Sequence, residues 1–136
     1  MERQKKVLDA SVLIKWFSQE ENTEKAIELR EQYIQQTIEI LIPELAFLEV
    51  INSLRYKKKN EEELKKIIKN FLDLQIGFVA LTEDLLNKTL KVALENNLTI
   101  YDSLYVAIAQ FHGCPLITAD KELYKIPNVI PLEKYD

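Results

Sequence analysis

Three acidic residues stand where the sequence predicts the edge of a parallel β-sheet. Asp9 follows an apolar segment that is typical of a buried strand. Asp102 opens a predicted helix that Gly113 ends, and Asp120 follows the short apolar strand predicted over Leu116 to Thr118. In α/β sheets, helices begin and strands end at the carboxyl edge, where ligands bind. We therefore expect these three carboxylates to converge.

A fourth acid, Glu49, lies in an unexpected place. It is embedded in the apolar run Leu45 to Ile51, where a helix leaves little surface for water. A buried carboxylate is costly unless it is paired or bound to a cation. A salt bridge to Arg55, to Lys58 or to another helix would satisfy it, and Asn52 would add a polar group on the same helical face.

Each of the other acids also has an ordinary structural interpretation. Asp9 would cap a helix predicted over Ser11 to Phe17, and Asp120 would cap Lys121 to Tyr124. Asp102 fits a capping box at the start of its own helix. Taken singly, these alternatives stay open, and only the convergence of four acids in one pocket favours chemistry.

Four carboxylates in one pocket repel one another unless divalent cations neutralise them. Mg²⁺ or Mn²⁺ suits such an all-oxygen site, whereas the single histidine, His112, and the single cysteine, Cys114, leave no zinc site. A divalent cation can lower the pKa of a water molecule bound to it and stabilise charge on a phosphoryl oxygen. The arrangement therefore indicates phosphodiester hydrolysis.

The elements that must position these acids alternate between strands and helices. This alternation predicts one α/β domain over residues 1–136, with a parallel sheet covered on both faces. No apolar run is long enough to span a bilayer, the lone cysteine fits a reducing compartment, and we expect a cytoplasmic protein. Strands are predicted over residues 5–9, 38–42, 77–81, 116–118 and 129–132, and helices over residues 11–17, 20–36, 44–58, 61–74, 83–96 and 102–112.

Several aromatic and basic residues allow two interpretations. Trp16 and Phe17 are expected in the core, with a partner surface as the alternative, and Tyr101 and Tyr105 are expected to be packing residues. The net charge of −4 argues against a protein that coats nucleic acid. Contact with an RNA backbone is the less favoured interpretation of the basic residues Lys15, Arg55, Lys57, Lys58, Lys59 and Lys121.

The four acidic stretches, in this order and at this spacing, resemble the motifs of PIN domains. More narrowly, they resemble the VapC-type toxins of prokaryotic toxin–antitoxin pairs. The resemblance covers essentially the whole chain and is carried by Val7 to Ser11, Glu49 to Leu54, Tyr101 to Ala109 and Leu116 to Asp120.

This resemblance implies a three-layer α/β/α fold with a mainly parallel sheet, and an endoribonuclease that depends on Mg²⁺ or Mn²⁺. It also implies a homodimer or higher homo-oligomer, and a small antitoxin that docks near the active site. It assigns metal binding and catalysis to Asp9, Glu49, Asp102 and Asp120, and a supporting role to Ser11, Asn52 and Thr118.

Other functions remain as alternatives. An RNA-processing nuclease without an antitoxin is the nearest, followed by a non-catalytic module that keeps the fold. Receiver domains and haloacid-dehalogenase-like phosphatases also place acids at a sheet edge. They need a second acid beside or two residues after the first, where this chain has Ala10 and Ser11.

Overall fold

The computed structural model describes residues 2–57 and 59–136 and contains one five-stranded sheet. The strand order is β3-β2-β1-β4-β5, and every pair is parallel, so the expected α/β architecture is confirmed. The strands are β1 (Gln4–Leu8), β2 (Ile38–Pro43), β3 (Gly77–Val79), β4 (Leu116–Thr118) and β5 (Val129–Pro131).

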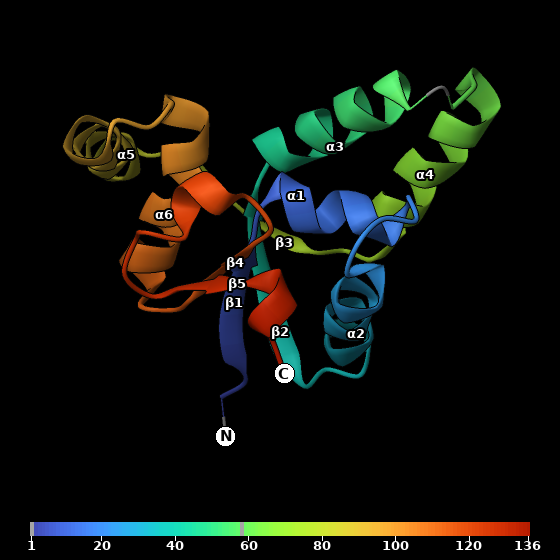
Figure 1. Cartoon of the computed structure of the whole chain (residues 1–136), viewed down its shortest axis with the longest axis horizontal. Coiled ribbons are helices and arrows are strands. Elements are labelled where there is room, and N and C mark those ends of the chain that lie inside the picture. The colour runs from blue at the N-terminus through green and yellow to red at the C-terminus, as the bar shows by residue number, and fades with distance from the viewer. Residues whose placement is uncertain (1, 58) are drawn as a thin grey trace.

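Helices cover both faces of this sheet. Figure 1 shows α5 and α6 on one side, and α1, α2 and α4 on the other, with α3 crossing above α1. The helices are α1 (Ala10–Leu13), α2 (Thr23–Ile34), α3 (Leu45–Tyr56), α4 (Glu61–Asp73), α5 (Glu83–Asn96) and α6 (Ile100–His112). The short 3₁₀ helices are η1 (Ile14–Trp16), which directly follows α1, and η2 (Lys121–Leu123) and η3 (Leu132–Lys134) near the end of the chain. No helix in the described residues is long and apolar enough to cross a membrane.

The central strand β1 lies beside β4, although the two strands come from opposite halves of the sequence. β1 pairs with β2 on one side and with β4 on the other, so Leu8 lies beside Ile117. Both side chains are fully buried, as expected of central parallel strands covered on both faces. The carboxyl ends of β1 and β4 therefore meet, and these are the ends that carry Asp9 and Asp120.

Helix α6 begins two residues earlier than predicted. Thr99 is its N-cap, and the Thr99 hydroxyl accepts the backbone N–H of Asp102 at 3.1 Å. The helix therefore opens at Ile100 and places Asp102 in its first turn. Gly113 ends the helix in the left-handed conformation, with φ of 61°, as the sequence predicts.

Other predicted boundaries need correction. The helix expected from Glu20 begins at Thr23, because Asn22 adopts a left-handed conformation with φ of 62°. The segment expected to be one helix over residues 11–17 divides into α1 and η1, and the strand expected to Leu81 ends at Val79. Lys58, the predicted last residue of the third long helix, lies outside the described residues.

The expected core positions of the aromatic residues are mostly confirmed. Trp16 is buried, and its ring meets Phe71 edge to face, with the centroids 6.2 Å apart. Phe17 packs beside both, and Cys114 is buried as predicted. Tyr101 is the exception: 61% of it is exposed, so its prediction as a packing residue is wrong.

Candidate active site

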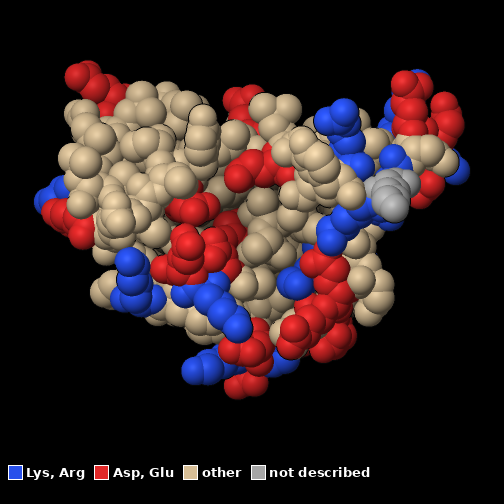
Figure 2. All heavy atoms as spheres, turned by 45° about the horizontal axis from the view of Figure 1, so that its top comes forward, with Lys and Arg blue, Asp and Glu red and all other residues tan. Residues whose placement is uncertain are grey.

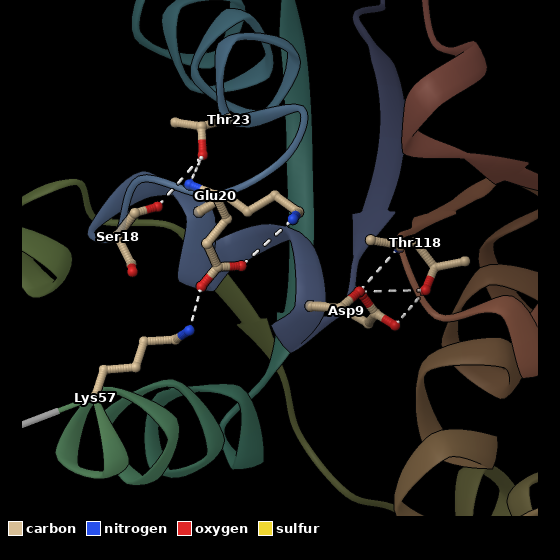
Figure 3. A network of polar contacts seen from close by, with 9 residues as sticks. Asp9, Ser18, Glu20, Thr23, Lys57 and Thr118 are labelled. Atoms are coloured by element: carbon tan, nitrogen blue, oxygen red, sulfur yellow. Dashed lines mark hydrogen bonds and ion pairs between the residues drawn. The ribbon is translucent and has the colours of Figure 1, made fainter.

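Asp9 lies directly after β1 and is held by two hydroxyl groups. Only 5% of the residue is exposed. The Ser11 hydroxyl donates to Oδ1 at 2.5 Å, and the Thr118 hydroxyl donates to Oδ2 at 2.6 Å (Figure 3). Asp9 occupies the N-cap position of α1, as its ordinary structural interpretation predicts, but its side chain makes no capping hydrogen bond to that helix. Both of its oxygens are oriented by side chains from two separate parts of the sequence.

The same two hydroxyls also accept hydrogen bonds from the chain after β4. The Ala119 N–H donates to Ser11 Oγ at 2.9 Å, and the Asp120 N–H donates to Thr118 Oγ1 at 3.0 Å. Ser11 and Thr118 therefore connect Asp9 to the backbone at Asp120. The structure thus places both hydroxyls beside Asp9 and Asp120, and their supporting role stays a prediction.

Asp120 has two roles that the sequence presented as alternatives. Its Oδ1 accepts the Glu122 N–H at 3.0 Å and so caps η2. Its carboxylate also lies near those of Asp102 and Glu122, with one oxygen of each within 4.8 Å of the others. Sequence reasoning missed Glu122, although an acid two residues after Asp120, at the start of a short turn, was a usable signal.

Glu49 reaches the site from α3, but it is half-buried and not enclosed by the helix. The apolar run around it does not bury α3 on all sides, because 71% of Leu48 is exposed. The alternative of an ion pair with Arg55 is not realised, and Lys58 lies outside the described residues. Instead, the Tyr105 hydroxyl on α6 donates to Glu49 Oε1 at 2.5 Å.

Asn52 does not join the other predicted site residues. It is exposed on α3, and within residues 2–57 and 59–136 its side chain makes no hydrogen bond to Glu49. Tyr105 takes the place that Asn52 was expected to fill. Its role was missed because an aromatic residue in an apolar stretch predicts packing, which Tyr105 also does.

The carboxylates carry negative charge that nearby basic residues do not neutralise. Burial, followed by the charges of Asp120 and Asp102, raises the pKa of Asp9 to about 6 although two hydroxyls stabilise its anion. Burial and then the charge of Asp120 raise the pKa of Asp102, and burial raises the pKa of Glu49. No ion pair within the described residues involves any of these four acids.

Figure 2 shows Asp and Glu side chains gathered around a hollow in the middle of one face, with Lys and Arg side chains at its margins. Two of the basic residues expected near this edge are paired. Glu20 lies 3.4 Å from the buried Lys15 ammonium and 2.6 Å from that of Lys57 (Figure 3). These ammonium groups hold the pKa of Glu20 below its usual value, despite its partial burial. Both ammonium groups are therefore already engaged by a carboxylate of the same chain.

The donor set fits a divalent cation of the hard type. All its donors are carboxylate oxygens, which Mg²⁺ and Mn²⁺ prefer, and the raised pKa values show that this charge is uncompensated. A cation would offset both the burial of the charged carboxylates, which is the main cause of the raised pKa values, and their mutual repulsion. Asp102, Asp120 and Glu122 are already close enough to share one ion.

Known proteins share both this sequence pattern and this fold. The model of the PIN domain matches residues 6–129. Ribonuclease VapC3 of Pyrobaculum aerophilum is 31% identical over 135 residues, covering 93% of this chain and 98% of that protein.

Solved structures agree with this assignment. PAE2754 of Pyrobaculum aerophilum is 26% identical with a TM-score of 0.65, covering 97% of this chain and 93% of that one. A toxin–antitoxin complex from Klebsiella pneumoniae has the same fold, with a TM-score of 0.70, 20% identity, and coverage of 95% and 98%. VapBC2 of Rickettsia felis, solved with a promoter DNA fragment, has a TM-score of 0.70, 16% identity, and coverage of 93% and 96%. The chain therefore belongs to the PIN-domain family and is a homologue of ribonuclease VapC.

Proposed function

We propose that this chain is an endoribonuclease that hydrolyses RNA phosphodiester bonds with Mg²⁺ or Mn²⁺, and that it is the toxin of a toxin–antitoxin pair. One observation carries the catalytic part: the carboxylates around Asp9 converge without a neutralising basic side chain, and burial, followed by the charges of Asp120 and Asp102, raises the pKa of Asp9 to about 6. Such a site is more stable with a divalent cation bound than when it is filled only with water. The relationship to ribonuclease VapC3 supports RNA as the substrate.

In this proposal Asp9, Glu49, Asp102 and Asp120 hold the cation, and Glu122 lies close enough to contribute. The bound cation would activate a water molecule and stabilise the charge that develops on the phosphate. Ser11 and Thr118 keep the Asp9 carboxylate oriented, so that it does not have to be ordered when the cation arrives. No histidine is near the group, since His112 lies at the far end of α6 from Asp102.

The experiment that tests the nuclease is RNA cleavage by the purified protein with Mn²⁺ or with EDTA. Wild type should cleave only with the metal, and Asp9→Asn and Asp102→Asn should fold normally but lose both cleavage and Mn²⁺ affinity. Asp73→Asn is the matched control, because Asp73 is an exposed acid on α4 that pairs with Lys69. Cleavage by Asp102→Asn at the wild-type rate would contradict the metal assignment.

The toxin role predicts a protein partner and growth inhibition. Complexes of toxins with antitoxins among the structural neighbours support this part of the proposal. Expression in bacteria should arrest growth, and Asp102→Asn should abolish the arrest at an equal level of soluble protein. Normal growth with abundant, active wild-type enzyme would instead favour an RNA-processing nuclease that has no antitoxin.

A further inference from the structure

Tyr105 links the two helices that carry Glu49 and Asp102. Its ring is buried on α6, with 1% of the residue exposed, and its hydroxyl reaches across to Glu49 Oε1 at 2.5 Å. Asp102 lies one helical turn before Tyr105 on the same helix, so these two side chains share a face. One buried side chain therefore connects the acid of α3 to the acid-bearing face of α6.

The two helices have little else in common. Helix α3 packs against α1, η1 and α4, whereas α6 packs against α5 and the sheet, and Figure 1 shows them diverging from the top of the sheet. Glu49 is half-buried and has three side-chain torsions. Without an anchor, a side chain of this kind samples several rotamers. The contact with Tyr105 selects one of them.

We propose that Tyr105 is a positioning residue, whose hydroxyl fixes the Glu49 carboxylate so that its second oxygen faces the cation held with Asp102. The inference rests on the proposed metal site and deepens it. A phenol is protonated at neutral pH and can only donate to a carboxylate. The hydroxyl therefore orders Glu49 without adding a charge that would compete with the cation.

The Asp9 carboxylate is also oriented by hydroxyl groups, but these belong to shorter side chains. Asp9 follows a central strand, and Ser11 and Thr118 lie near enough to hold both of its oxygens. Glu49 comes from a helix farther from the sheet, where a longer donor is needed. Tyr105 supplies that length from a rigid, buried ring.

The test is Tyr105→Phe, which keeps the ring and removes only the hydroxyl. Partners that orient metal ligands typically contribute about 10–100-fold to metal affinity or activity. We expect Mn²⁺ to bind Tyr105→Phe at least about 10-fold more weakly in calorimetry without RNA. We also expect kcat to fall, to recover partly at high Mn²⁺, and KM for RNA to stay unchanged.

Tyr33→Phe is the matched control. The Tyr33 hydroxyl donates to the backbone carbonyls of Leu74 and Gln75 at 2.9 Å, away from the acids. Its loss should lower the melting temperature and leave Mn²⁺ affinity unchanged. If Tyr105→Phe behaves in the same way, Tyr105 has a merely structural role and the proposal is wrong.

Two further variants keep the result interpretable. In Glu49→Gln, addition of Tyr105→Phe should cause little further loss of Mn²⁺ affinity, because the hydroxyl acts through the Glu49 carboxylate. If Tyr105→Phe fails to fold, Glu49→Asp withdraws the carboxylate from the hydroxyl with the core intact, and should also weaken Mn²⁺ binding. Equal, independent losses in the double variant would overturn the proposal. Absence of Mn²⁺ binding by wild type would instead refute the proposed function itself.

Discussion

At the scale of single residues, the Thr118 side chain makes two hydrogen bonds and is not exposed to water. Its hydroxyl donates to Asp9 and accepts the Asp120 N–H, and its side chain is fully buried. Thr118→Val keeps the shape but leaves both partners unsatisfied, which should cost about 1–3 kcal/mol of unfolding free energy. We expect Mn²⁺ affinity to fall about 10-fold or more.

Thr118→Ser is the control for this change, because it keeps the hydroxyl and loses one methyl group. It should retain Mn²⁺ affinity and lose about 1 kcal/mol of stability. Urea unfolding and calorimetry measure the two quantities separately. Equal Mn²⁺ affinities for the valine and serine variants would show that the hydroxyl does not support the site.

The raised pKa of Asp9 predicts how stability depends on pH in metal-free protein. The unfolded carboxyl titrates near its ordinary value of 3.8, whereas the folded one titrates at about 6. Between these values the folded state binds more protons, so raising the pH lowers the unfolding free energy by on the order of 3 kcal/mol. Asp102 and Glu49 contribute in the same direction because burial and neighbouring acids raise their pKa values too.

Urea unfolding at about pH 5 and about pH 7 tests this prediction. Wild type should be more stable at the lower pH, and saturating Mn²⁺ should remove much of the difference. Asp9→Asn should flatten the dependence, because its side chain does not titrate. The Glu20 pKa is lowered, so its opposite effect falls at more acidic pH, outside this window. A wild-type stability that rises steadily across the window would refute the assigned shift.

At the scale of elements, Gly113 ends α6 in a left-handed backbone conformation that favours glycine. Gly113 has φ of 61°, and a Cβ placed there would contact nothing within 4 Å. Gly113→Ala should therefore cost about 1–2 kcal/mol through backbone strain alone. Gly77→Ala is the matched control, since that glycine also has open space but no positive φ, and it should be neutral or slightly stabilising. Equal effects of the two substitutions in urea unfolding would contradict this account.

Elements were predictable where local signals agree with the fold. The cap at Thr82, the glycine at Gly113 and the apolar strand Leu116–Thr118 set boundaries that the structure reproduces. The start of α2 was not predictable, because the preceding loop is fixed by a left-handed Asn22 and by the Thr23 hydroxyl, which accepts the Glu20 N–H. Both features lie within residues 20–23, and the periodicity of apolar residues, from which the helix was predicted, does not record them.

The candidate site was likewise predictable in part. Types and spacing were sufficient to select Asp9, Asp102 and Asp120, because strand order places the ends of β1 and β4 together. Sequence did not reveal the phenol of Tyr105, since its partner is 56 positions away on another helix. A long-range contact between an aromatic residue and an acid leaves no local pattern.

At the scale of the whole molecule, α5 leaves an apolar stripe uncovered. Leu86, Leu90 and Leu94 recur every four residues and are all exposed, and Ile100 and Tyr101 at the start of α6 are exposed too. Exposed apolar surface of this kind marks a protein interface. The expected homodimer therefore has a candidate surface here.

Leu90→Glu tests that assignment by light scattering after gel filtration. It should shift wild-type dimer toward monomer without lowering the melting temperature of the monomer. Leu72→Glu is the control, because Leu72 lies on the separate apolar groove between α3 and α4 and should leave the mass unchanged. If only Leu72→Glu dissociates the protein, the self-contact lies at α3 and α4 instead.

The pairing of β1 with β4 also affects when the candidate site is completed during the protein's own synthesis. Asp9 is translated well before Thr118, which lies 109 positions later and whose hydroxyl holds one of the two Asp9 carboxylate oxygens. A nascent chain that has not reached β4 lacks this strand and Asp120, so the carboxyl edge of its sheet is incomplete. A site divided in this way between the two halves of the sequence is completed only after β4 has been translated.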